Sequence, residues 1–141
     1  MLLLERNLSM ERNGEYVGTI IVNFILFYIF NNLLNWNVYF VTSALTEVLW
    51  IINLSIVVAI IGNFLMLVYR PEWFRHVTRI VLNIFAFAAV YLVYIIFPFN
   101  FSNSFLNWGL SVLLFLALIG IIIATIVEIY LLVTGKPKLR N

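Results

Sequence analysis

Long apolar blocks constrain this chain more than any motif in it. The longest runs from Val38 to Tyr69, and Glu47 is its only charged residue. A run of this length is too continuous for a helix of a soluble core, whereas about 20 apolar residues are enough to cross the ~30 Å hydrocarbon layer of a membrane. A helix over all of Val38–Tyr69 would be about 48 Å long at ~1.5 Å per residue. We therefore expect a membrane span that tilts or extends past the bilayer.

Three further apolar blocks complete the pattern. The four predicted spans cover about residues 16–34, 38–69, 72–97 and 105–134. Of the 141 residues, 65% are hydrophobic and 10% are charged, whereas about 25% are charged in a soluble domain. The sequence therefore predicts an all-α, polytopic membrane protein with four transmembrane helices in an up-down bundle. Membrane lipids are its expected surroundings.

The basic residues predict the orientation of these spans. Before the first span, between the second and third, and after the fourth lie Arg6, Arg12, Arg70, Arg75, Arg79, Lys136, Lys138 and Arg140. The connections 35–37 and 99–104 contain no Lys or Arg. Because Lys and Arg accumulate on the cytoplasmic side of membrane proteins, we expect both termini in the cytoplasm and a location in the plasma (inner) membrane.

The two chain ends are expected to lie outside the spans. Residues 1–15 form a cytoplasmic segment that is either a frayed terminus or a short interfacial helix on the membrane surface. Residues 135–141 form a basic cytoplasmic tail.

The composition excludes several kinds of chemistry. The chain has no Cys, no Asp and one His, which removes thiol chemistry, Ser/His/Asp triads and Cys-ligated metals. There is no Gly-rich phosphate loop, and the basic residues are too dispersed for nucleic acid. We expect a protein that is not an enzyme and that holds no metal or cofactor.

Glu47 is the first candidate for function, because an ionisable residue inside a span is costly and suggests a functional site. If the span starts at Val38, Glu47 lies about 13 Å along it. Ser43, Trp50 and Asn53 fall near it on one face. The residues expected at the same depth in the third and fourth spans are Tyr91, Tyr94 and Ser111. Low dielectric disfavours the charged form of the carboxyl, so the group is either a proton or cation site or a neutral acid hydrogen-bonded across the bundle.

Two further sets of charged residues lie near the cytoplasmic end. Arg79 and Glu128 are expected at equal depth in sequential antiparallel spans, which predicts a structural ion pair. The group Arg70, Arg75 and His76 could contact anionic lipid headgroups, although the topology signal explains the same residues equally well.

Small residues form two stripes that allow close approach of another helix. The stripe in the fourth span is Ala117, Gly120 and Ala124, and the stripe in the second span is Ser55, Ala59, Gly62 and Asn63. A helix with two packing faces favours a homo-oligomer or a membrane-protein partner.

Two functions follow from these observations. The first is a non-enzymatic scaffold or accessory protein that binds lipid or protein partners within the bilayer. The second is a small oligomeric transporter or channel in which Glu47 takes a proton or cation.

Overall fold

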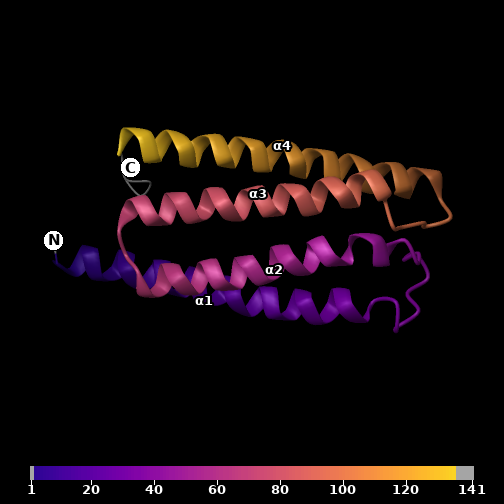
Figure 1. Ribbon diagram of the computed structural model, residues 1–141, viewed down its shortest axis with the longest axis horizontal. Coiled ribbons are helices and arrows are strands. Elements are labelled where there is room, and N and C mark those ends of the chain that lie inside the picture. The colour runs from indigo at the N-terminus through magenta and orange to yellow at the C-terminus, as the bar shows by residue number, and fades with distance from the viewer. Residues whose placement is uncertain (1, 136–141) are drawn as a thin grey trace.

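The computed structural model describes residues 2–135 and consists of four long helices (Figure 1). These are α1 (Leu2–Asn32), α2 (Leu45–Val68), α3 (Glu72–Ile96) and α4 (Ser104–Thr134). Successive helices run in opposite directions, so the start of α1, the α2–α3 connection and the end of α4 lie at one end of the molecule (Figure 1). All four helices are long and apolar enough to cross a membrane. The prediction of an all-helical chain with four such helices is confirmed.

The helices form an open row. Helix α1 packs on α2, α2 on α3 and α3 on α4, and no other pair of helices has close backbone contacts within residues 2–135. Helix α1 reaches α3 through long side chains at its N-terminal half. Because α1 and α4 do not pack on each other, a space remains between the two helical hairpins.

Helix α2 is shorter than predicted. It begins at Leu45 instead of Val38, and the preceding residues form turns and extended backbone. Asn37 adopts a left-handed conformation with φ of 54°, which interrupts helical geometry at this point. An apolar run rich in β-branched and aromatic residues cannot be assigned to helix or extended chain by periodicity alone. In this run, backbone groups of residues 40–42 form hydrogen bonds outside the helix.

These hydrogen bonds join residues 40–42 to the α3–α4 connection, which lies at the same end of the molecule. The Thr42 amide donates to the Pro98 carbonyl at 3.0 Å, and the Asn100 amide donates to the Phe40 carbonyl at 2.7 Å. The rings of Phe40 and Phe101 stack with centroids 4.7 Å apart. Backbone groups of 40–42 that would otherwise join a helix are satisfied by residues 98–100, and this pairing ties the two hairpins together.

The second predicted boundary that differs is the start of the first helix. Residues 2–15 are helical and continuous with the rest of α1, whose N-terminal end extends beyond the neighbouring helices (Figure 1). Leu, Glu, Arg and Met favour helix, which explains this continuity. Lys136, Lys138 and Arg140, from the predicted basic tail, lie outside the described residues.

The small-residue stripe of α2 packs inside the molecule. A Cβ on Gly62 would lie 3.0 Å from Leu82 Cδ2 and 3.2 Å from Thr78 Cγ2, so the absent side chain lets α2 and α3 approach closely. Asn63 is also buried, and its side-chain amide donates to the Ala59 carbonyl. Gly62 therefore lies at the α2–α3 interface, and its position in this stripe needs no second copy of the chain to explain it.

The stripe of α4 has the opposite environment. Ala117, Gly120 and Ala124 are exposed, and a Cβ on Gly120 would meet no atom within 4 Å. Because these three residues are exposed, this face of α4 is open to another helix. Self-association through it stays a prediction.

Candidate functional site

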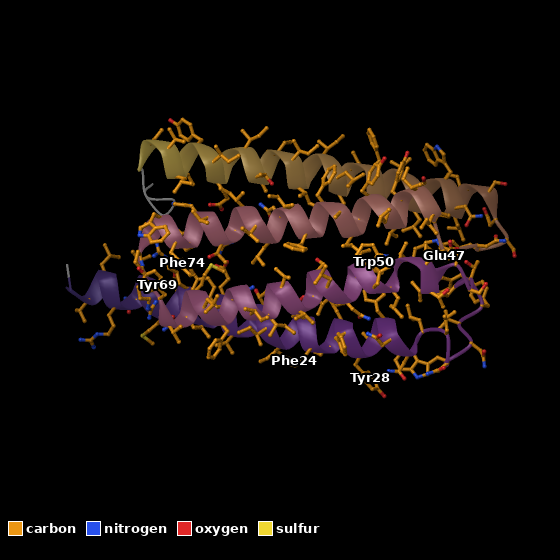
Figure 2. The ribbon with its side chains drawn as sticks, viewed as in Figure 1. Phe24, Tyr28, Glu47, Trp50, Tyr69 and Phe74 are labelled. Atoms are coloured by element: carbon orange, nitrogen blue, oxygen red, sulfur yellow. The ribbon has the colours of Figure 1, made fainter. Side chains whose placement is uncertain are left out.

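Glu47 does not occupy the depth that its place in the sequence predicted. It lies in the first turn of α2 and is exposed, close to the end of the molecule that carries the α1–α2 connection (Figure 2). The estimate of about 13 Å assumed a helix starting at Val38. With the start at Leu45, Glu47 is about 3 Å from the helix end, where the helix dipole favours an acidic side chain.

The residues expected around Glu47 make other contacts. Asn53 exchanges two hydrogen bonds with Asn31 of α1, at 2.7 and 3.0 Å. Tyr91 stacks on Phe87. Tyr94 packs against Phe115 and lines a shallow pocket that also includes Trp108 and Ser111. Ser43 and Trp50 are exposed near Glu47. The structure therefore does not assemble the predicted carboxylate site.

The strongest concentration of polar groups lies at the opposite end of the helices. We call it the ionic cluster, and it consists of Arg12, Glu15, Glu72, Arg75, His76, Arg79 and Glu128. Three helices contribute to it: α1 brings the first two residues, α3 the next four and α4 the last. Arg75, His76 and Glu128 are buried, with 6%, 3% and 3% of their surface exposed. Ionisable groups are seldom buried without pairing, so each has a partner to be identified.

Glu72 joins α1 to α3 in this cluster. One of its carboxylate oxygens accepts from Arg12 Nη1 at 2.6 Å, and the other accepts from Arg75 Nη2 at 2.5 Å. Its side chain remains 42% exposed. Glu72 therefore contacts the buried Arg75 and is itself accessible from outside the protein.

Glu128 and Arg79 are paired differently from the prediction. Arg79 Nη2 donates to Glu15 Oε1 at 2.7 Å, while Glu128 Oε1 lies 2.7 Å from His76 Nδ1. The predicted depths were compatible with an Arg79–Glu128 pair, but the continuation of α1 to Leu2 brings Glu15 alongside α3. Arg79 then pairs with α1, and His76 pairs with α4.

His76 has a carboxylate near each ring nitrogen. Its Nδ1 lies 2.7 Å from buried Glu128, and its Nε2 lies 3.8 Å from Glu72 Oε2. The first contact is a hydrogen bond, while the second exceeds hydrogen-bond length. The imidazole thus lies between one buried and one partly exposed acid.

This geometry also corrects the predicted headgroup site. Arg75 and His76 are buried, and their polar atoms face Glu72 and Glu128. Among the three residues, Arg70 is exposed. The sequence showed their charge but not that acidic residues of the same chain would neutralise it.

A second feature is an apolar cavity between the hairpins. It has a volume of about 350 Å³, and all four helices contribute to its wall. Its lining residues are Asn23, Leu26, Phe30, Ile52, Ser55, Ile56, Ala86, Ala89, Val90, Val93, Phe99, Leu110 and Leu114. Asn23 and Ser55 are the polar residues among them, and none is charged. Sequence reasoning missed this cavity because it arises from the open row and not from a motif.

The described residues, 2–135, contain no group of three or more His, Asp or Glu residues placed to hold a metal ion. Comparisons of the chain with protein-family models, curated proteins and solved structures found no match. Function must therefore be argued from the cluster and the cavity.

Proposed function

We propose that this is a non-enzymatic accessory protein that crosses a membrane four times and binds the hydrocarbon chain of a membrane lipid between its two hairpins. The observation that carries the proposal is the uncharged cavity of about 350 Å³ that all four helices line. A cavity of about 150 Å³ already holds a benzene-sized molecule, so this one has room for roughly a dozen carbon atoms. An α-helix is ~10 Å in diameter with its side chains and would not enter.

Aromatic residues support the placement of the helices in a bilayer. On α4, Trp108 and Tyr130 are 63% and 54% exposed and lie about 33 Å apart along the helix. On α2 and its C-cap, Trp50 and Tyr69 are also exposed and lie about 28 Å apart. Exposed Trp and Tyr are enriched at both faces of a membrane, and these spacings match a ~30 Å hydrocarbon layer.

The basic residues support an orientation with both chain ends in the cytoplasm. The start of α1 and the α2–α3 connection lie at one end of the molecule (Figure 1). The Lys and Arg of residues 2–135 lie in the first half of α1, in the α2–α3 connection and in the first two turns of α3. The positive-inside rule assigns this end to the cytoplasm. Glu47 is exposed in the first turn of α2, and proton or cation transport at this residue stays a prediction.

The lipid proposal is tested by photo-crosslinking. The full-length protein is placed in phosphatidylcholine vesicles that contain a diazirine-bearing acyl chain, and labelled residues are mapped by mass spectrometry. We expect enrichment at residues of the cavity wall, such as Ala89 and Leu114. Ala86→Trp should fill the cavity and reduce this labelling by about tenfold, equivalent to ~1.4 kcal/mol of lost binding.

Ala124→Trp is the matched control, because Ala124 is exposed on α4 and is not part of the cavity wall. It should leave the labelling of the cavity unchanged. Uniform labelling of all outward faces, with no enrichment in the cavity, would reject the proposal.

A further inference from the structure

His76 connects a partly exposed acid to a buried acid, and this arrangement has no role in lipid binding. Glu72 has 42% of its side chain exposed, whereas the side chains of His76 and Glu128 are each 4% exposed. The three residues come from two helices and lie in series from Glu72 Oε2 through the imidazole ring to Glu128 Oε1, with a gap of 3.8 Å on the Glu72 side. An ionic pair that served only to hold α3 to α4 would not require an imidazole between two acids.

We infer that Glu72, His76 and Glu128 form a proton relay that loads and unloads a proton at the buried Glu128 carboxyl. Neutral imidazole has one nitrogen that carries a proton and one that accepts, so it can gain a proton on one side and release a proton on the other. Carboxylates face both sides of His76. The ligand of this site is a proton.

The transfer step balances without any other reactant. The Glu72 carboxylate first takes up a proton from solvent and passes it to His76 Nε2, while the proton on Nδ1 moves to Glu128 Oε1. Glu72 is left again as the carboxylate that pairs with Arg12 and Arg75. The ring changes from the Nδ1–H to the Nε2–H tautomer, and the reverse step restores it. The gap of 3.8 Å on the Glu72 side is closed by a bridging water or by rotation of the exposed Glu72 side chain.

Other charged groups surround the relay and keep its total charge low. Helix α1 contributes Arg12, which pairs with Glu72, and Glu15, which pairs with Arg79. Helix α3 contributes Arg75, also on Glu72. Tyr16 of α1 is buried, and α2 contributes no charged residue here because its only one, Glu47, is at the opposite end. The arginines bind the outer acid, Glu72, from two sides, and the imidazole contacts the inner acid.

The experiment follows proton arrival at Glu128 by time-resolved infrared spectroscopy after a rapid drop in pH. The band of the protonated Glu128 carboxyl is identified as the part of the signal that is lost in Glu128→Gln. In the wild type it should rise quickly. In His76→Gln, which can accept a hydrogen bond but cannot relay a proton, the rise should slow by about 10²-fold, the lower end of what a positioned acid–base group contributes.

Glu47→Gln is the control, because it makes the same carboxyl-to-amide change far from the relay, and it should leave the rise time unchanged. An equal rise time in His76→Gln and wild type, or no Glu128-dependent band in the wild type, would overturn the relay.

A second measurement does not depend on a histidine variant. His76 is the only histidine in the chain, so its imidazole nitrogens give unambiguous ¹⁵N signals. Glu128→Gln should change the Nδ1 signal and Glu47→Gln should not. An unchanged Nδ1 signal in Glu128→Gln would contradict the contact. Neither readout involves lipid, so the relay and the lipid proposal can fail separately.

Discussion

Single residues decide how closely the helices approach each other, and Gly62 shows this most clearly. Only hydrogen occupies the position where a Cβ would lie 3.0–3.3 Å from Leu82 and Thr78. The same residue type at Gly120 meets nothing within 4 Å. Two glycines that look equivalent in an apolar sequence therefore have different roles, one in packing and one on an exposed surface.

Gly62→Leu is expected to destabilise the protein by about 1–3 kcal/mol, the usual cost of overpacking a filled interface. Gly120→Leu is the matched control and should change stability by less than ~0.5 kcal/mol. The measurement is reversible unfolding in mixed detergent micelles followed by circular dichroism. Equal effects of the two substitutions would show that Gly62 does not limit the α2–α3 distance.

Hydrogen-bonded side chains join neighbouring helices along the row. Asn31 of α1 and Asn53 of α2 exchange two hydrogen bonds near the end that carries the connections. The adjacent Asn32 bonds to the Tyr28 carbonyl of its own helix. Asn31 Nδ2 also donates to the Phe27 carbonyl of its own helix at 2.7 Å, so the contact between the helices depends on the amide of Asn53. An amide pair of this kind restricts both the rotation and the depth of one helix against the next.

Asn53→Leu should therefore destabilise the α1–α2 contact by ~1 kcal/mol. Asn32→Leu should have a smaller effect, because the Asn32 amide bonds within its own helix. The double variant Asn31→Leu/Asn53→Leu should lose less than the sum of the single variants, since neither residue is then left with an unpaired amide. Unfolding in the same micelles measures the wild type, the three single variants and the double variant, and strict additivity would argue against the pair.

The whole molecule is held together differently at its two ends. At one end, the two connections pair through the Thr42–Pro98 and Asn100–Phe40 hydrogen bonds. At the other end, the ionic cluster links α1, α3 and α4. Between these ends, α1 and α4 have no close backbone contact within residues 2–135, and the cavity fills the space. The two ties keep the row open without letting the hairpins separate.

The proposed threading is testable because the natural chain contains no cysteine. Single cysteines at Asn35 and Ser102 should react with a membrane-impermeant maleimide in intact cells. Cysteines at Asn7 and Tyr69 should react only after permeabilisation, since they lie at the end that carries the basic residues. Reaction of Asn35→Cys and Tyr69→Cys from the same side would refute the four-span threading.

The sequence alone predicted four long apolar helices, because length and hydropathy belong to each segment separately. An apolar segment must satisfy its own backbone hydrogen bonds wherever water is excluded. The polar residues between the apolar blocks indicate roughly where each helix ends. The exception was 38–44, whose backbone is satisfied by residues 98–100.

Only the tertiary structure decided which side chains meet. The choice of Glu15 over Glu128 as the partner of Arg79 depends on the length of α1 and on the rotation of three helices about their axes. The placement of His76 between Glu72 and Glu128 has the same origin. Rotation and lateral order are collective properties of packed helices, since every neighbour changes the preferred face of the next. For this reason the ionic cluster and the cavity could not be read from any single segment.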